Sequence, residues 1–204
     1  MPVSIETASR ILLPVFLVLF FVIAMAGRSF LHWKRTGVNP YKLGKTESAH
    51  DLIGAMFRTV SFLVIFSTAV YSFLPSVYGY LGRIEWLESV WVQATGFVLL
   101  LAALIWVSVG QGHMGESWRI GIDEENETEL VHKGLFSLSR NPIFLGMRVL
   151  LFGLFLAAPN ALTLLAFGVG DVLMQVQVRL EEQHMLRLHG ERFEEYKKQV
   201  RRWV

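Results

Sequence analysis

The chain contains no cysteine among its 204 residues, and only 18% of the residues are charged. The absence of cysteine excludes disulfide bonds, thiolate metal ligands and a cysteine nucleophile. Soluble domains carry about 25% charged residues. Here 53% of the residues are hydrophobic and the mean hydropathy is +0.44. Because the apolar residues also lie in long blocks, the composition excludes a disordered chain and indicates an integral membrane protein.

The chain also has little excess charge, with a net charge of +2. Its lysine and arginine residues are concentrated in a few loops, which is typical of membrane topology rather than of a nucleic-acid surface. We therefore expect the lipid bilayer and a lipophilic molecule as partners, and no nucleic acid.

Five apolar segments have about the length that a bilayer-spanning helix needs, which is about 20 residues. They cover residues 11–30, 52–74, 89–109, 143–158 and 161–178. Only Pro159 and Asn160 separate the last two, which predicts a tight helical hairpin. The sequence thus predicts a single all-α membrane domain over residues 1–204, with five transmembrane helices. A cytoplasmic tail over residues 179–204 would carry an amphipathic helix.

Basic residues are distributed unequally between the two ends of these predicted helices. One side holds Arg10, Arg83 and the Pro159–Asn160 turn. The other side holds Arg28, Lys34, Arg35, Lys42, Lys45, Arg119, Lys133, Arg140, Arg179, Arg187, Arg192, Lys197, Lys198, Arg201 and Arg202. Basic residues favour the cytoplasmic side, so we expect the N-terminus outside and the C-terminus in the cytoplasm. An even number of helices would remove this asymmetry.

Three charged residues lie inside the predicted helices, namely Arg58, Arg148 and Asp171. At a rise of about 1.5 Å per residue, each would lie about 8 to 10 Å below the cytoplasmic end of its helix. Charges at this depth are costly and are usually paired or line a wet cavity. We expect Asp171 to pair with Arg148, Arg58 or both. A purely structural ion pair and a role at a substrate cavity both remain open.

The residues best suited to bind a ligand or take part in a reaction follow the third predicted helix. Asn141 before Pro142 is typical of a helix start, and the free N–H groups there, beside Arg140, predict an anion site. Glu181 and Glu182 leave the fifth predicted helix on the same side. The apolar stripe that continues from Glu182 comprises Leu186, His189, Phe193, Tyr196, Val200 and Trp203. This phase predicts that Glu182 faces inward, with Glu181 turned about 100° away. The structural alternative is an arginine at the membrane edge and a solvated glutamate pair.

Four short motifs follow one another in the last part of the chain, and their order is informative about function. They are LVHKGLF at 130–136, RNPIFLG at 140–146, EE at 181–182 and VRRW at 200–203. This order, around a short hairpin, resembles the membrane methyltransferases related to isoprenylcysteine carboxyl methyltransferase and phosphatidylethanolamine N-methyltransferase. The family pattern is Leu-Val-Thr-x-Gly-x-Tyr, Arg-His-Pro-x-Tyr-x-Gly, Glu-Glu and Val-Pro-Arg-Trp. The first two predicted helices carry no motif.

The resemblance implies that S-adenosylmethionine binds in a cytoplasmic pocket formed by the last two helices and the tail. The implied cofactor-binding residues are Gly110, Gly112, His132, Gly134, Phe136, Arg140, Pro142, Phe144, Gly146, Glu181 and Glu182. Arg140 and Glu182 would also be the catalytic pair, with Arg140 holding the cofactor's carboxylate and Glu182, with or without Glu181, its ammonium or ribose. Phe136, Phe144 or Trp203 would contact adenine. No metal is expected.

The sequence departs from the family pattern at several of these positions, since His132 replaces threonine, Asn141 replaces histidine, and Phe136 and Phe144 replace tyrosine. These changes leave the methyl acceptor open between an isoprenylcysteine-like carboxylate and a phospholipid amine. An amine acceptor would require a base, for which His113, His132 and His189 are candidates. Residues 112–119 would line the entrance, whereas the acidic segment Asp123–Glu129 is expected to be a solvated turn.

Two other functions remain open from the sequence. One is an NADPH-dependent membrane reductase of the sterol-reductase type, although no basic cluster clearly suits a 2′-phosphate. The other is a small non-enzymatic transporter or channel, in which Arg58, Arg148 and Asp171 would form an ion path. No inverted repeat supports the latter.

Overall fold

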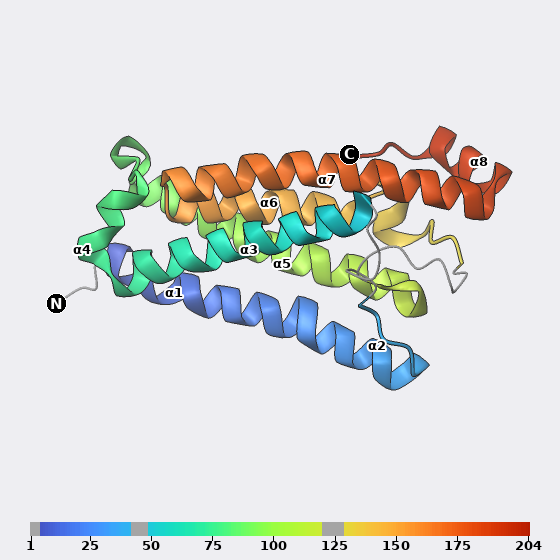
Figure 1. The fold of residues 1–204 in the computed structure, drawn as a ribbon, viewed down its shortest axis with the longest axis horizontal. Coiled ribbons are helices and arrows are strands. Elements are labelled where there is room, and N and C mark those ends of the chain that lie inside the picture. Colours follow the sequence, from blue (N-terminus) through green and yellow to red (C-terminus); the bar gives the residue numbers. More distant parts are fainter. Residues whose placement is uncertain (1–4, 42–48, 120–128) are drawn as a thin grey trace.

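The computed structural model describes residues 5–41, 49–119 and 129–204, and the described residues form helices without any named strand. The long helices lie side by side along the long axis of the molecule (Figure 1). The first comprises α1 (Ile5–Phe20), a π-helical stretch (Phe21–Gly27) and α2 (Arg28–Thr36). The others are α3 (Ala49–Phe73), α5 (Val90–Met114), α6 (Pro142–Ala157) and α7 (Ala161–His189). Two short helices, α4 (Pro75–Tyr78) and α8 (Glu191–Gln199), lie at opposite ends.

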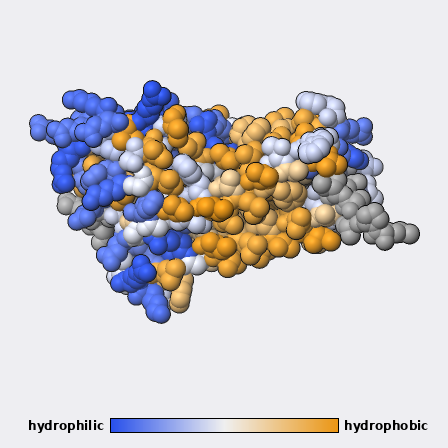
Figure 2. Space-filling view, turned by 180° about the vertical axis from the view of Figure 1, so that it is seen from behind, coloured by the Kyte–Doolittle hydropathy of each residue, from blue (hydrophilic) through white to orange (hydrophobic). Residues whose placement is uncertain are grey.

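Four of these helices are long and apolar enough to cross a membrane, namely Thr7–Thr36, Ala49–Phe73, Val90–Ser117 and Ala161–His189. They confirm a multi-pass, nearly all-helical membrane protein. The predicted span 143–158 corresponds to α6, which has 16 residues and is about 24 Å long. Five complete spans therefore stay a prediction. Figure 2 shows the apolar surface of the bundle, with hydrophilic residues gathered at the end where α8 lies.

The last predicted span ends at residue 178, and α7 continues beyond it as one helix to His189, as the helical phase from Glu182 predicts; the chain then turns at Gly190. No glycine or proline interrupts residues 179–189, so the helix has no local reason to end there. The basic residues of this segment form a solvated face, and charge alone does not end a helix. The amphipathic helix of the tail is α8, which is short and buries Phe193 and Tyr196.

Small residues allow α5 and α6 to approach each other closely, and this pair makes the most extensive helix contact of the described chain. A methyl group added to Gly96 would lie 2.6 Å from the backbone nitrogen of Ala157 and 2.8 Å from the carbonyl oxygen of Gly153. One added to Gly146 would lie 2.6 Å from Val107. Close backbone approach of this kind is typical of helix pairs in membranes, where packing replaces the hydrophobic effect.

A buried asparagine organises the end of the bundle that contains α4, which we call the far end. Asn160 is 0% exposed and caps α7 through the N–H groups of Leu162 and Thr163. Its amide nitrogen donates to Ser67 Oγ at 3.0 Å. The neighbouring Pro159 carbonyl accepts from Tyr78 OH at 3.1 Å. Backbone hydrogen bonds also join the hairpin turn to the segment that contains Arg83, so the predicted grouping of Arg83 with this turn is confirmed.

The opposite end, which we call the cavity end, is where α2, α5 and α7 finish and α3 and α6 begin (Figure 1). The π-helical stretch is tied to α5 there, because Gln111 donates to the carbonyl of Ala24 at 2.8 Å with both groups buried. Arg28 donates to the Gly115 carbonyl at 2.7 Å and lies over the ring of Trp118. These bonds hold the first helix against the end of α5.

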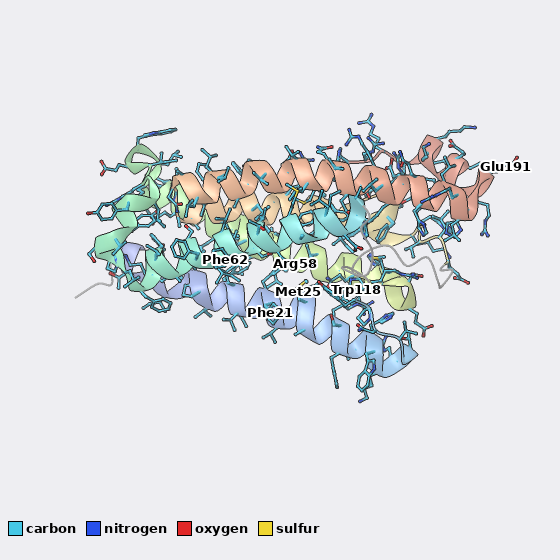
Figure 3. The ribbon with its side chains drawn as sticks, viewed as in Figure 1. Phe21, Met25, Arg58, Phe62, Trp118 and Glu191 are labelled. Atoms are coloured by element: carbon cyan, nitrogen blue, oxygen red, sulfur yellow. The ribbon has the colours of Figure 1, made fainter. Side chains whose placement is uncertain are left out.

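The three charged residues inside the helices separate into two groups. Arg148 and Asp171 form an ion pair between α6 and α7, as predicted, and the ring of Trp203 lies 4.7 Å from the Arg148 guanidinium carbon. Arg58 does not join them. It donates to the hydroxyl of Tyr41 at 3.3 Å instead. Arg58 is exposed on α3, one turn before Phe62 on the same helix (both are labelled in Figure 3). Its side chain therefore does not reach the hairpin of α6 and α7.

Because α5 and α6 pack closely, we expect the stability of the fold to be sensitive to any side chain added at Gly96. We expect Gly96→Ala to lower the thermal unfolding midpoint in detergent, because the added methyl group meets backbone atoms that cannot rotate away. Overpacking of this kind costs about 1–3 kcal/mol. The matched control is Gly168→Ala in α7, where an added methyl group meets nothing within 4 Å. Equal midpoints for the two variants would contradict the packing argument.

The distribution of basic residues predicts the orientation, which two single-cysteine variants can test in a chain without native cysteine. Glu85→Cys lies at the far end and Lys198→Cys in α8, and both replace exposed side chains. We expect a membrane-impermeant maleimide to label Glu85→Cys in intact cells, and Lys198→Cys only after permeabilisation. The reverse pattern would show that the cavity end faces outward.

Candidate functional site at the cavity end

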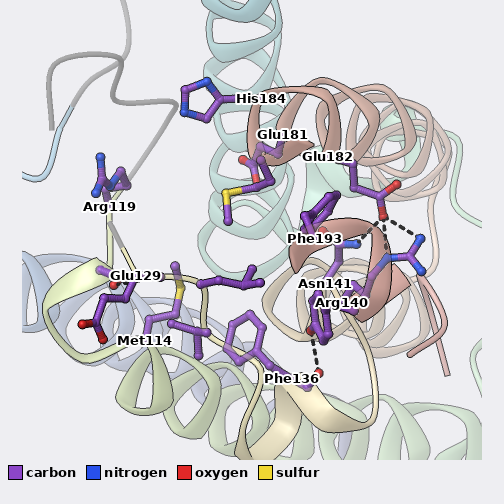
Figure 4. A pocket seen from close by; sticks show the side chains of 15 residues that line it. Met114, Arg119, Glu129, Phe136, Arg140, Asn141, Glu181, Glu182, His184 and Phe193 are labelled. Carbon is purple, nitrogen blue, oxygen red and sulfur yellow. Dashed lines mark hydrogen bonds and ion pairs between the residues drawn. The ribbon is translucent and has the colours of Figure 1, made fainter. Parts of the chain in front are cut away.

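A cavity lies at the cavity end between the ends of α5 and α7, the segment that precedes α6, and α8. The centre of a water-sized molecule can occupy about 150 Å³ of it, and one side is open. Much of its wall is apolar, formed by Met114, Leu130, Val131, Phe136, Met185 and Phe193. Figure 4 shows these side chains around the space, with Phe136 opposite α7. A mostly apolar cavity with a few polar groups is typical of a small-molecule site.

Glu182 forms the centre of a charged cluster on one wall of the cavity, which we call the tail clamp. Its Oε1 accepts from Nη2 of Arg140 at 3.0 Å, and its Oε2 accepts from Nη2 of Arg202 at 2.7 Å. The Arg140 and Glu182 side chains are only 9% and 10% exposed. Glu182 therefore faces inward, as the helical phase predicted. The same bond raises the pKa of Arg202, which keeps its guanidinium charged.

Arg140 also binds the backbone of the C-terminal segment. Its Nη1 donates to the carbonyl of Val200 at 2.6 Å and to that of Lys197 at 3.2 Å. The Arg140 backbone N–H donates to the Arg201 carbonyl at 2.9 Å. Arg140 and Glu182 are thus bound to each other and to the tail. The geometry shows that both residues hold the tail in place, and the predicted role of each in holding a different group of a ligand stays a prediction.

Asn141 precedes the first residue of α6, so the predicted helix start at Pro142 is confirmed. Its side chain does not cap the helix, however. The amide nitrogen instead lies 3.4 Å from both Glu182 Oε1 and the Arg202 carbonyl. The amide nitrogen donates to a charged carboxylate there, and this bond orients the side chain toward the tail clamp and away from the first N–H groups of α6.

Tyr196 ties α8 to the same wall. Its hydroxyl donates to the carbonyl of Phe136 at 2.6 Å, and both residues line the cavity. Burial raises the pKa of Tyr196 to about 12, so the phenol remains a neutral donor throughout the physiological range. This bond holds Phe136 and α8 together across the cavity.

Glu181 lines the cavity on the side of His184, away from the tail clamp (Figure 4). It accepts a hydrogen bond from Nε2 of Gln177 at 2.8 Å. The helical phase placed Glu181 about 100° from Glu182, and the cavity is wide enough for both directions to open into it. The two acids therefore occupy different surroundings within one site.

Only four of the predicted site residues line the cavity, namely Phe136, Arg140, Glu181 and Glu182. The others support it or lie apart from it. Gly110 and Gly146 lie in the contact between α5 and α6, and the Pro142 carbonyl accepts from the Trp106 indole at 2.8 Å. Gly112 faces open space, His132 is exposed, and Phe144 and Trp203 do not line the cavity.

Gly134 has a structural role that its motif did not predict. It has φ +63°, and a methyl group there would lie 2.5 Å from the ring of His113. Nδ1 of His113 accepts the N–H of Leu135 at 3.2 Å. His113, one of three predicted candidates for a base, thus shapes the loop that carries Phe136. None of those three histidines lines the cavity.

Several lining residues were missed by sequence reasoning. They include His184 and Met185, together with Glu129, the described residue of the segment 123–129 that was expected to be a solvated turn, whereas 123–128 lie outside the described residues. Met114, Ser117 and Arg119 do fall in the segment predicted to form an entrance. His184 and Met185 lie three and four residues after Glu181 on α7 and so share its face of the helix, which was the signal that would have found them.

These features define the class of the molecule as a multi-pass helical membrane protein with a cavity where the bundle meets its polar end. A family model described as a protein of unknown function, DUF1295, matches residues 7–200. Since this match covers almost the whole chain, the protein belongs to the DUF1295 family. No curated protein matches the chain.

The tail clamp predicts a stability effect of Glu182. We expect Glu182→Gln to destabilise the fold by about 3 kcal/mol, because it leaves two buried or half-buried arginines without their acid. The control is Glu194→Gln, which removes an exposed pair with Lys197 and should cost under about 1 kcal/mol. Thermal unfolding and the rate of tryptic cleavage near Arg201 measure the two effects. Equal cleavage rates would show that the clamp does not hold the tail.

Proposed function

We propose that the protein transfers a methyl group from S-adenosylmethionine to a lipophilic acceptor at the cytoplasmic face of the membrane. The observation that carries this proposal is the cavity itself, which joins an aromatic and apolar wall to a carboxylate. It lies at the polar end of an apolar helical bundle. A cofactor with an adenine ring, an ammonium group and a sulfonium centre would find a matching surface for each part. The order of the motifs at 130–136, 140–146 and 181–182 supports the same assignment.

Methyl transfer requires little of the protein beyond alignment of the cofactor and the acceptor. The sulfonium methyl group is already activated, so transfer requires in-line placement of the acceptor in a pocket that excludes water. Phe136 and Phe193 are the aromatic side chains in position to contact adenine. The tail clamp of Arg140, Glu182 and Arg202 would exclude water by holding the C-terminal segment closed.

The acceptor is proposed to be lipophilic because the cavity lies at the end of helices whose outer faces are apolar. An isoprenylcysteine-like carboxylate would need no base, whereas a phospholipid amine must lose a proton before it attacks. His184 is the histidine that lines the cavity and is therefore the candidate base for an amine. A methyl-labelled cofactor incubated with a membrane extract distinguishes the two acceptors through the labelled product.

Cofactor binding gives the direct test. We expect S-adenosylhomocysteine to bind the purified protein in calorimetric titration, and Met185→Trp to weaken binding at least about tenfold by filling the cavity, since affinity falls tenfold per 1.4 kcal/mol. The matched control is Leu186→Trp, which changes an exposed neighbour that does not line the cavity. NADPH is titrated in parallel. Binding of NADPH in place of S-adenosylhomocysteine would replace the proposal with the membrane reductase.

A transporter would behave differently from either enzyme. Ion flux in vesicles that Asp171→Asn abolishes, without any binding of S-adenosylhomocysteine, would defeat the enzymatic proposal. The Arg148–Asp171 pair is closed by Trp203, which favours a structural role for it over an ion path.

A further inference from the structure

A chain of hydrogen bonds reaches Glu181 from another helix. Nε2 of Gln177 donates to Oε1 of Glu181 at 2.8 Å, and Oε1 of Gln177 lies 3.0 Å from Nδ1 of His50. His50 is at the start of α3, whereas Gln177 and Glu181 lie one turn apart on α7. Gln177 is buried, at 5% exposed. A buried amide bonded at both ends has one orientation, so the position of Glu181 is set from α3.

The direction of these bonds favours the ionised form of Glu181. An ionised carboxylate only accepts hydrogen bonds, so the Gln177 amide must turn its nitrogen toward Glu181 and its oxygen toward His50. His50 must then donate from Nδ1. A protonated Glu181 that donated to Gln177 would require the amide to flip and His50 to change tautomer. The hydrogen bond from Gln177 therefore offsets part of the cost of burying a negative charge at the cavity wall.

The two adjacent acids differ in what balances their charge. Glu182 is neutralised by Arg140 and Arg202 within the tail clamp. Among residues 5–41, 49–119 and 129–204, no lysine or arginine forms a salt bridge with Glu181, and its hydrogen bond comes from the neutral Gln177 amide. A negative charge that faces a largely apolar cavity without a paired cation attracts a cationic group, because the low dielectric there strengthens the attraction.

We infer that Gln177 and His50 are positioning residues, which hold the carboxylate of Glu181 toward the cavity and toward the cationic group that the motif assigns to it. For the ligand proposed above the cation is the ammonium group of S-adenosylmethionine, which S-adenosylhomocysteine also carries, and this identification rests on the proposed function. The positioning itself is a property of the protein alone and can be measured without that ligand.

Labelling by a hydrophobic carbodiimide, which reacts with protonated carboxyl groups, measures the positioning. We expect Gln177→Leu to move the labelling profile of Glu181 toward higher pH, so that labelling in the alkaline range rises several-fold, since a hydrogen bond to a charged group is lost. Peptide mass spectrometry reports the labelled residue, and the labelling profile is followed against pH. The charged or titratable groups that also line the cavity (Arg119, Glu129, Arg140, Glu182, His184 and Tyr196) are the same in each variant.

The control is Gln175→Leu, the same substitution on α7 at a residue bonded to Arg179 and not lining the cavity. It should leave the labelling profile unchanged. His50→Ala should shift the profile in the same direction as Gln177→Leu, and His50→Gln, which restores an N–H donor, should largely reverse that shift. Equal labelling in Gln177→Leu and Gln175→Leu would overturn the inference.

Titration with S-adenosylhomocysteine separates this inference from the proposed function. We expect Gln177→Leu to weaken binding about tenfold and Glu181→Gln at least as much, while Gln175→Leu binds like wild type. Wild-type binding by Glu181→Gln would overturn the cationic role of Glu181. Absence of binding by the wild type would defeat the proposed function, and the labelling profile would then decide the positioning by itself.

Discussion

The cavity depends on one buried carboxylate, Glu182, held between two arginines. Arg140 comes from the start of α6 and Arg202 from the end of the chain, so a single acid on α7 joins three segments that are distant in sequence. The hydrogen bonds that the Arg140 guanidinium donates to the carbonyls of Lys197 and Val200 fix the course of the tail. Paired and hydrogen-bonded charges of this kind are tolerated in a protein interior because each partner satisfies the other. With the tail in place, α8 closes the cavity through Phe193 and Tyr196.

The cavity also requires the helices behind it to be fixed. The contact between α5 and α6 brings backbones together through Gly96, Gly146 and Gly153, which places the start of α6 beside the end of α5. At the far end, buried Asn160 holds the hairpin turn to Ser67 and to the loop beyond α4. The wall of the site is therefore assembled by rigid packing along the bundle, and the ligand-facing side chains are carried on its end.

The adjacent acids Glu181 and Glu182 have different partners, and this difference gives the site its chemical character. One carboxylate is used to hold the structure closed, and the other is held toward the cavity by a neutral amide. Adjacent residues on a helix point about 100° apart, which is enough for one to meet the arginines of the tail and the other to meet Gln177. The helical phase predicts from sequence that the two acids point in different directions, but it does not reveal which partner each acid meets.

Sequence alone determined the membrane class, the positions of the apolar helices, the hairpin at Pro159–Asn160 and the helix start at Pro142. These follow from local properties, namely long apolar runs, proline and the spacing of polar residues. It also restricted the partners of Asp171 to Arg148 and Arg58, because equal depth in a bilayer limits the partners of a charge, and the structure selects Arg148.

Tertiary structure decided the remainder. It showed that Arg58 bonds to Tyr41, and that Arg140 and Glu182 pair with each other. It also added His184 and Met185 to the cavity, and moved Phe144 and Trp203 away from it. Each of these depends on which side chains meet across elements that are far apart in the chain. Local periodicity sets the direction of a side chain on its own helix, but only the packed bundle determines what lies opposite.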